Sequence, residues 1–181
     1  MAVQDTFMYF GFGSNMLRER LHMSCPSAEK VAIGRIKDYS LSFASVSENL
    51  DRWNGGVADI LSSAGAEVWG VVWRISNNEQ EFLDIQEGVH DGVYSPFEVA
   101  VELDNSEPTI HCRCYKVNSF KPASPSLQYA KVIFLGAEQN ALPEHYRHNL
   151  QSMKTNGSKV PVPILDKLQS LLQQHNSTTT Q

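Results

Sequence analysis

The order in which strand-like and helix-like segments follow each other limits this chain to few folds. Strand-like runs, each bounded by turn residues, fill the first two-thirds of the sequence. These runs are TFMYFG (6–11), YSLSFAS (39–45), GGVADIL (55–61), EVWGVVWRI (67–75), SPFEVAVEL (95–103) and TIHCRCYKV (109–117). Two short helical segments interrupt them, at 15–22 and 77–88, and the last third carries helical periodicity at 124–141, 143–153 and 162–175.

This order predicts an α+β domain, because the regular alternation of strands and helices that builds a parallel sheet is missing. We expect a small mixed β-barrel of about six strands, with inserted short helices and C-terminal helices. A length of 181 residues and a hydrophobic content of 41% suit one domain with a single core, which we place at residues 1–175. Residues 176–181 are polar and are expected to form a disordered tail.

Charge and composition argue against several classes of partner. The formal net charge is -5, and scattered Lys and Arg residues form no basic stripe, so we expect no nucleic acid partner. No segment approaches the roughly 20 apolar residues of a membrane span, and the N-terminus lacks a secretory pattern, which predicts a cytoplasmic protein that binds no membrane. Cys112 and Cys114 lie two positions apart in one expected strand, so their side chains share a face, and both are expected to be buried thiols. No neighbouring His and Cys set completes a metal site, so we expect no metal.

The segment YFGFGSN (9–15) places two glycines and a polar pair directly behind an apolar strand. It resembles the start of a dinucleotide-binding loop, but Met16 stands where the third glycine should be and no βαβ unit surrounds it. A strand-to-helix turn explains it better. Its backbone N–H groups can bind an anion or a developing oxyanion, and Ser14 or Asn15 can cap the next helix. A plain glycine-rich turn explains the segment equally well.

A second candidate is QEGVHDGVY (86–94), where Gly88 is well suited to end the preceding helix. Glu87 then lies at the helix C-terminus, on the flank of the apolar face. Its carboxylate is either an ordinary solvated group, or partly buried with its pKa raised towards the working pH of a general acid/base. Three other acids, Glu67, Glu98 and Glu102, are expected on the surface. Three tryptophans, Trp53, Trp69 and Trp73, are expected in the core and not in contact with a ligand.

Five ordered blocks of the sequence together resemble the γ-glutamylcyclotransferase family. They are YFGFGSN (9–15), GGVADI (55–60), EVWGVVWRI (67–75), DIQEGVHDGVY (84–94) and SPSLQYAKVI (124–133). The resemblance runs from Tyr9 to Tyr129 and more loosely into the C-terminal helices. It implies a small α+β fold around a compact barrel, often assembled as a homodimer. It also implies a reaction without a cofactor, in which a γ-glutamyl amino acid becomes 5-oxoproline and a free amino acid.

The resemblance also implies a role for particular residues. Glu87 corresponds to the general acid/base, and Tyr94 and Tyr129 correspond to aromatic residues that border the site. The substrate-binding loop corresponds to Tyr9, Phe10, Gly11, Phe12, Gly13, Ser14 and Asn15. Phe12 stands where the family usually has Tyr, so the ring is kept and a hydroxyl group is lost. Gly11 replaces an alanine, which is a milder difference.

Two alternative functions remain open at this point. The nearer one is a related enzyme that cyclises γ-glutamyl amines, such as the ε-linked γ-glutamyl-lysine that crosslink breakdown releases. The other is a non-catalytic interaction module that keeps the pocket. Phe12 favours the non-catalytic module and the presence of Glu87 argues against it; tight binding of 5-oxoproline without turnover would support it.

Overall fold

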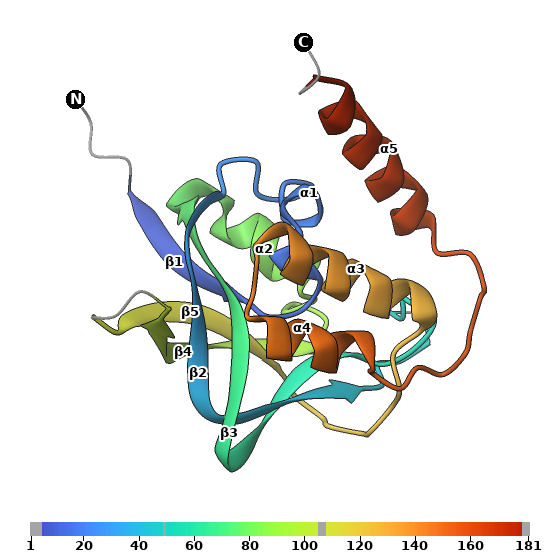
Figure 1. Ribbon diagram of the computed structural model, residues 1–181, viewed down its shortest axis with the longest axis horizontal. Helices are drawn as coiled ribbons and strands as arrows, with labels where there is room; N and C mark the ends of the chain where they lie inside the picture. The colour runs from blue at the N-terminus through green and yellow to red at the C-terminus, as the bar shows by residue number, and fades with distance from the viewer. Residues whose placement is uncertain (1–4, 49, 105–107, 179–181) are drawn as a thin grey trace.

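The fold is a closed five-stranded barrel with helices packed around its outside (Figure 1). The computed structural model describes residues 5–48, 50–104 and 108–178. The strands are β1 (Thr6–Gly11), β2 (Glu29–Ala44), β3 (Val57–Ser76), β4 (Tyr94–Leu103) and β5 (Ile110–Val117). They are hydrogen-bonded in the order β1-β3-β2-β4-β5, and the parallel pairing of β1 with β5 closes the barrel. The predicted α+β barrel is therefore confirmed, with five strands in place of about six.

The strand count differs because two of the expected strands belong to one long strand. β3 joins the runs predicted at 55–61 and 67–75 into one strand that begins at Val57, and β2 begins at Glu29 and not at residue 39. The register between β2 and β3 jumps from Lys37↔Glu67 to Tyr39↔Ser62. Asp38 lies at this bulge with φ 62° and accepts a 2.9 Å hydrogen bond from the Gly65 N–H. The small polar residues between the two runs look like a turn in the sequence, but they form a bulge that bends a continuous strand.

The helices are mostly shorter than the sequence predicts, except the last one, which is longer. They are η1 (Ser14–Met16), α1 (Arg18–Leu21), η2 (Asn77–Glu79), α2 (Gln80–Gln86), α3 (Leu127–Gln139), α4 (Glu144–Gln151) and α5 (Pro163–Thr178). The expected helix at 15–22 is thus divided into η1 and α1. Gly13 and Leu17 take their N-cap positions without a side-chain cap, so the capping role expected of Ser14 or Asn15 is wrong.

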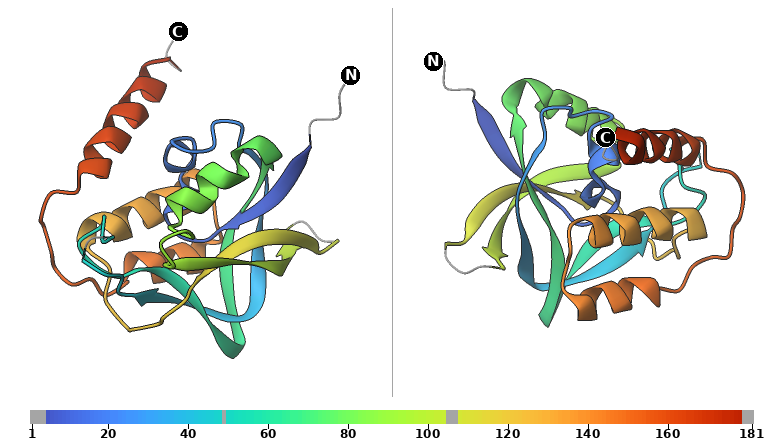
Figure 2. Two further views of the ribbon diagram at one scale, coloured as in Figure 1. Left: turned by 180° about the vertical axis from the view of Figure 1, so that it is seen from behind. Right: turned by 45° about the horizontal axis from the view of Figure 1, so that its top comes forward.

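The last helix, α5, lies beside α1 at the end of a long connection from α4 (Figure 2). Its Leu168 side chain is buried, which anchors the helix to the rest of the molecule. Helix α5 continues to Thr178 and so overlaps the first three residues of the expected tail at 176–181, while residues 179–181 lie outside the described residues. No helix in the described ranges combines the length and the apolar content that a membrane crossing requires.

Helix α3 covers one end of the barrel and packs directly on η1. The Ser126 hydroxyl accepts a 3.1 Å hydrogen bond from the Tyr129 N–H and caps the helix. One face is buried at Val132, Ile133 and Ala137. At Gly136 a methyl group would lie 2.7 Å from the Leu17 nitrogen, so only glycine permits this close contact. This packing holds Tyr129 next to the loop that follows β1.

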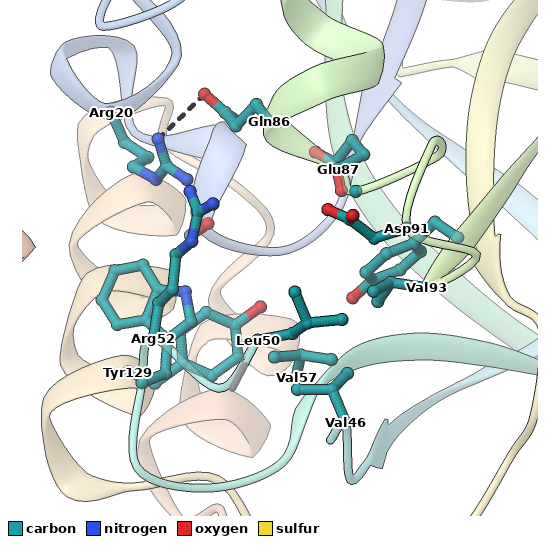
Figure 3. Close-up of a pocket in the computed structure, with 14 residues that line it drawn as sticks. Arg20, Val46, Leu50, Arg52, Val57, Gln86, Glu87, Asp91, Val93 and Tyr129 are labelled. Atoms are coloured by element: carbon teal, nitrogen blue, oxygen red, sulfur yellow. Dashed lines mark hydrogen bonds between the residues drawn. The ribbon is translucent and has the colours of Figure 1, made fainter. Parts of the chain in front are cut away.

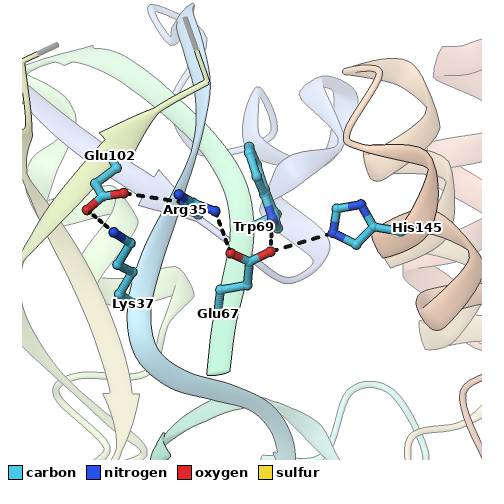
Figure 4. A network of polar contacts seen from close by, with 6 residues as sticks. All are labelled: Arg35, Lys37, Glu67, Trp69, Glu102 and His145. Atoms are coloured by element: carbon cyan, nitrogen blue, oxygen red, sulfur yellow. Dashed lines mark hydrogen bonds and ion pairs between the residues drawn. The ribbon is translucent and has the colours of Figure 1, made fainter. Parts of the chain in front are cut away.

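A polar network on the outside of the barrel connects it to α4 (Figure 4). Glu67 accepts hydrogen bonds from Arg35 at 2.8 Å and from the Trp69 indole at 2.9 Å, and it lies 3.5 Å from His145 of α4. Arg35 also contacts Glu102. Glu67, expected to be an ordinary surface acid, therefore joins two strands to a helix.

The cysteines confirm the sequence prediction. Cys112 and Cys114 are buried free thiols inside the barrel wall, and Cys25 is buried as well. Burial raises the pKa of the Cys112 thiol to about 12, which keeps it protonated. These cysteines contribute to packing as small apolar side chains.

Candidate active site

The loop after β1 brings one polar side chain to the centre of a cleft. β1 ends at Gly11, which pairs with Val71, and the chain then turns through Gly13 into η1. A methyl group on Gly13 would lie 2.9 Å from the Ala58 side chain, so the loop approaches β3 closely only because a glycine stands there. The turn directs Asn15, which is buried, towards the end of α2.

Asn15 joins three residues of the cleft through both ends of its amide. Its Nδ2 donates to the Tyr9 hydroxyl at 2.9 Å and to Glu87 Oε1 at 2.8 Å. Its Oδ1 accepts a 2.8 Å hydrogen bond from Gln86 Nε2. The amide orientation is therefore determined, because only the NH₂ group can donate to the carboxylate.

Glu87 owes its position to the way α2 ends. Gly88 adopts φ 66°, and its N–H donates to the Ile85 carbonyl at 3.0 Å while the Val89 N–H donates to the Asp84 carbonyl at 2.9 Å. This pair of bonds is the Schellman motif, so the helix end predicted at Gly88 is confirmed. The residue before the glycine is thereby held at the helix C-terminus and faces the cleft.

A second group of hydrogen bonds holds the neighbouring Gln86. Its Oε1 accepts a 2.8 Å hydrogen bond from Arg20 Nη1 (Figure 3). It also accepts a 2.6 Å hydrogen bond from the Ser24 hydroxyl. Arg20 and Ser24 lie in and just after α1, so this network ties α1 to α2. Asn15 and Gln86 together fix the direction of the Glu87 side chain.

Burial raises the pKa of Glu87 to about 7, since the cleft removes its carboxylate from bulk water. The positive charge of Arg20 and the hydrogen bond from Asn15 lower the pKa and so limit this rise, whereas the Asp84 charge adds to it. A carboxyl group in this state accepts and releases a proton near neutral pH.

Two tyrosines are held at the backbone of the same β3 residue, Ala58. The Tyr94 hydroxyl donates to the Ala58 carbonyl at 2.7 Å, and the Ala58 N–H donates to the Tyr129 hydroxyl at 3.0 Å. Burial raises the pKa of Tyr129 to about 12, so this phenol stays neutral. The Tyr129 hydroxyl also forms a side-chain hydrogen bond with Ser14.

A third polar group, formed by Arg113, Asp84 and Tyr115, lies beside the cleft. Arg113 of β5 donates to both oxygens of Asp84, at 2.7 and 2.9 Å, and the Tyr115 hydroxyl donates to the same carboxylate. The Tyr115 ring packs edge-on against Tyr9 with the centroids 5.9 Å apart. This group connects α2 to β5 of the barrel wall, next to Tyr9.

The cleft has two adjoining chambers. The inner chamber, about 40 Å³, is lined by Tyr9, Phe12, Gly13, Asn15, Ala58 and Tyr115. The outer chamber, about 80 Å³, is lined among others by Arg20, Leu50, Arg52, Trp53, Asp91 and Val93. Four residues border both chambers, namely Ser14, Glu87, Tyr94 and Tyr129. The Glu87 carboxyl group therefore stands at the junction.

The structure brings together most of the residues predicted from the sequence. Phe10 is an exception, because it is fully buried in the core on the opposite side of β1 from Tyr9. Gly11 is also absent from the lining of either chamber and lies against the Asn15 carbonyl instead. Phe12 lines the inner chamber, with its ring centroid 6.5 Å from that of Phe10.

Sequence reasoning missed several residues around the cleft. They are Arg20, Ser24, Arg52, Gln86 and Asp91, while Trp53, expected in the core, is buried but also lines the outer chamber. Gln86 carried a signal, because it directly precedes Glu87 in the QEG block. Arg20 and Arg52 carried none, since their neighbours in space come from distant segments.

Comparisons with known proteins point in one direction. Residues 67–150 match the AIG2-like family. A mouse protein named gamma-glutamylcyclotransferase is 40% identical over 174 residues, which cover 96% of this chain and 91% of the mouse protein. Its human namesake is 40% identical over 84% of this chain and 81% of its own length. A solved structure titled gamma-glutamyl cyclotransferase superimposes with a TM-score of 0.86 at 36% identity, covering 94% of this chain and 99% of that one.

Proposed function

The chain belongs to the γ-glutamylcyclotransferase family, and on this premise we propose that it cyclises a γ-glutamyl amino acid to 5-oxoproline and releases the free amino acid. One observation carries the proposal. The Glu87 carboxyl group, with a pKa of about 7, borders both chambers of the cleft, so it can reach the two nitrogen atoms that exchange protons in this reaction.

The two chambers suit the two halves of such a substrate. The glutamyl group lies in the inner chamber, between Tyr9 and the loop at Gly13. The leaving amino acid extends into the outer chamber past Leu50 and Val93. The scissile amide then lies at the junction, next to Glu87. Holding the glutamyl arm folded there supplies much of the proximity effect, because closure of a five-membered ring is intramolecular.

Glu87 acts first as a base and then as an acid. Its carboxylate accepts a proton from the substrate α-ammonium group, and the freed nitrogen lone pair attacks the γ-carbonyl carbon to form the new C–N bond. The tetrahedral intermediate collapses, the old C–N bond breaks, and the Glu87 proton passes to the departing nitrogen. The ring nitrogen loses its second proton to solvent, and the released amine takes one from solvent. Such acid/base help contributes about 10² to 10⁴ in rate.

Backbone donors in the loop stabilise negative charge. The N–H groups of Gly13 and Ser14 have no protein acceptor among the described residues, so they are free to donate to the substrate α-carboxylate or to the oxyanion of the intermediate. Gly11, which the sequence also suggested as a donor, belongs to the β1–β3 ladder and is left out of this role.

The test compares Glu87→Gln with a matched variant of the same helix. Formation of 5-oxoproline from γ-glutamyl-alanine is measured for wild type, Glu87→Gln and Glu81→Gln. Glu81 is an exposed α2 acid that lines neither chamber. We expect Glu87→Gln to lose at least about 100-fold in kcat, and Glu81→Gln to match wild type. Normal turnover by Glu87→Gln would exclude Glu87 as the acid/base. A wild type that cyclises no γ-glutamyl compound would refute the proposed cyclotransferase activity.

Three further proposals concern the setting of the enzyme, and each rests on the family resemblance. We propose that the protein forms a homodimer, that it works in the cytoplasm, and that its reaction belongs to the γ-glutamyl cycle of glutathione metabolism. Sedimentation at micromolar concentration measures the oligomeric state directly, and a single species with the mass of the 20.3 kDa chain would contradict the dimer.

A further inference from the structure

Two arginine side chains meet at one wall of the outer chamber without a carboxylate between them. Figure 3 shows the guanidinium groups of Arg20 and Arg52 on the same side of the chamber, across from Glu87 and Asp91, and the Arg52 charge acts on Arg20. Arg20 is 7% exposed. Among the described residues its guanidinium group hydrogen-bonds only to the neutral Gln86 and Met23 side chains, and its buried Nε has no partner. Arg52 is exposed and makes no hydrogen bond or ion pair within the described part of the chain.

This pair differs from most of the other arginines in the described part of the chain. Arg35, Arg74 and Arg113 each contact a carboxylate at 2.6 to 2.8 Å. At the chamber wall the two like charges instead disfavour each other. Burial lowers the pKa of Arg20, the Glu87 charge across the chamber raises it in part, and the Arg52 charge lowers it again. An arrangement that costs folding energy is explained if a bound anion completes it.

The location of the pair identifies which anion fits. No cationic side chain is among the described residues that line the inner chamber, so the pair does not face the glutamyl end. It faces the outer chamber, whose apolar wall at Leu50 and Val93 suits an amino-acid side chain. The carboxylate of a leaving amino acid is only two bonds from the nitrogen that Glu87 protonates. Asp91, across the chamber, repels that carboxylate and directs it to the arginine side.

We propose that Arg52, with the charge of Arg20 on the same side of the chamber, binds the α-carboxylate of the leaving amino acid and so makes the enzyme prefer γ-glutamyl amino acids over γ-glutamyl amines. This inference rests on the proposed cyclotransferase function. Arg52 is a specificity-determining residue, because it contacts a group of the substrate whose own bonds do not change in the reaction. An arginine suits this task, since its planar guanidinium donates two parallel hydrogen bonds to a carboxylate.

The test crosses a change in the enzyme with a change in the substrate. We compare kcat/KM for γ-glutamyl-alanine and for γ-glutamyl-alanine amide, which has the same shape without the negative charge. We expect wild type to prefer the acid by about 10-fold or more, as for a hydrogen bond to a charged group. Arg52→Gln should lose about 10-fold on the acid and nothing on the amide, and raised salt should weaken wild-type turnover of the acid alone.

Two variants control for unspecific effects. Lys131→Gln removes the same unit charge from an exposed position on α3 outside both chambers and should keep the wild-type preference. Arg52→Lys keeps the charge without the planar fork and should lie between wild type and Arg52→Gln.

The outcomes separate the two claims. Equal loss on both substrates, or no loss on either, would overturn the role of Arg52 and leave the cyclotransferase reaction standing. A wild type that turns over neither substrate would overturn the reaction, and the specificity with it.

Discussion

At the residue scale, the chemistry depends on the pKa of Glu87, which its surroundings both raise and lower. Burial raises its pKa, and Arg20 and Asn15 partly reverse that rise. A fully exposed Glu would be ionised and too weak a base at neutral pH, whereas a fully buried and unpartnered one would stay protonated. The partners of Glu87 therefore matter as much as its burial.

Removing the Asn15 amide should move the pH dependence of the reaction. In Asn15→Ala the carboxylate loses a donor that stabilises its charged form, so the pKa of Glu87 rises. The ascending limb of the kcat/KM profile, near pH 7 in wild type, should shift to more alkaline pH, with a larger loss of activity at pH 6 than at pH 9. Arg20→Gln should shift it in the same direction. Tyr9→Phe, which keeps the Asn15–Glu87 bond, is the control, and an unmoved limb in Asn15→Ala would contradict this account.

At the scale of the element, helix α2 positions Glu87, and it does so through the glycine that ends it, Gly88. The helix has only seven residues, exposes Phe82 and Ile85, and is fixed mainly by buried Leu83 and by the Arg113–Asp84 contact. Such a short helix is marginal without tertiary contacts. Its last turn is therefore a point where backbone conformation and catalysis are coupled.

Gly88→Ala should affect stability and activity together. A side chain at φ 66° costs about 1 to 2 kcal/mol, and the added methyl group would lie 3.1 Å from Val93. Gly65→Ala is the matched control, because Gly65 has φ 77° and open space around it at the distant β2–β3 bulge. Urea unfolding should give similar losses for the two variants, while only Gly88→Ala lowers kcat. Equal kcat values for the two variants would show that the α2 end does not position Glu87.

At the scale of the whole molecule, buried carboxyl groups with raised pKa values and a hydrogen-bonded one with a lowered pKa together predict that the protein is most stable at mildly acidic pH. The pKa of Glu87 is raised to about 7 from an ordinary 4.5, so the folded state binds more protons in this window and the free energy of unfolding falls as pH rises through it. Burial raises the pKa of Asp59, which acts in the same direction from pH 3.8 upwards. Hydrogen bonds lower the pKa of Glu67 below 4.5, so its contribution is present above that pH and is lost on acidification.

The unfolding free energy should therefore be highest near pH 5 and decline by roughly 2 kcal/mol towards pH 8, with water in the cleft screening part of the effect. Most of the decline should disappear in Glu87→Gln, which would be more stable than wild type at pH 8 although it is inactive. Urea titrations from pH 4 to pH 8 measure both curves. A Glu87→Gln curve parallel to that of wild type would show that Glu87 is not protonated in the folded protein near pH 6.

Part of the fold and of the site could be predicted without coordinates. Runs of period two and 3.6 correctly predicted a barrel followed by helices, and Gly88 correctly predicted the end of α2. The bulge at Asp38 was not predictable, because a long bent strand has no hydrophobic period where it bends outward. From the sequence, Glu87 could be either solvated or partly buried with a raised pKa. The sequence could not decide between them, because the burial of Glu87 depends on segments far away in the chain.

By itself, then, the sequence determined the order of the elements and the family to which the chain belongs, because these depend on patterns among near neighbours. Only the tertiary structure decided that Tyr9 and not Phe10 faces the cleft, that Asn15 holds Glu87, and that Arg20 and Arg52 meet at its mouth. The physical reason is that barrel closure and the packing of α2 and α3 bring remote segments together. The resulting loss of water around Glu87 sets its pKa, which no local pattern records.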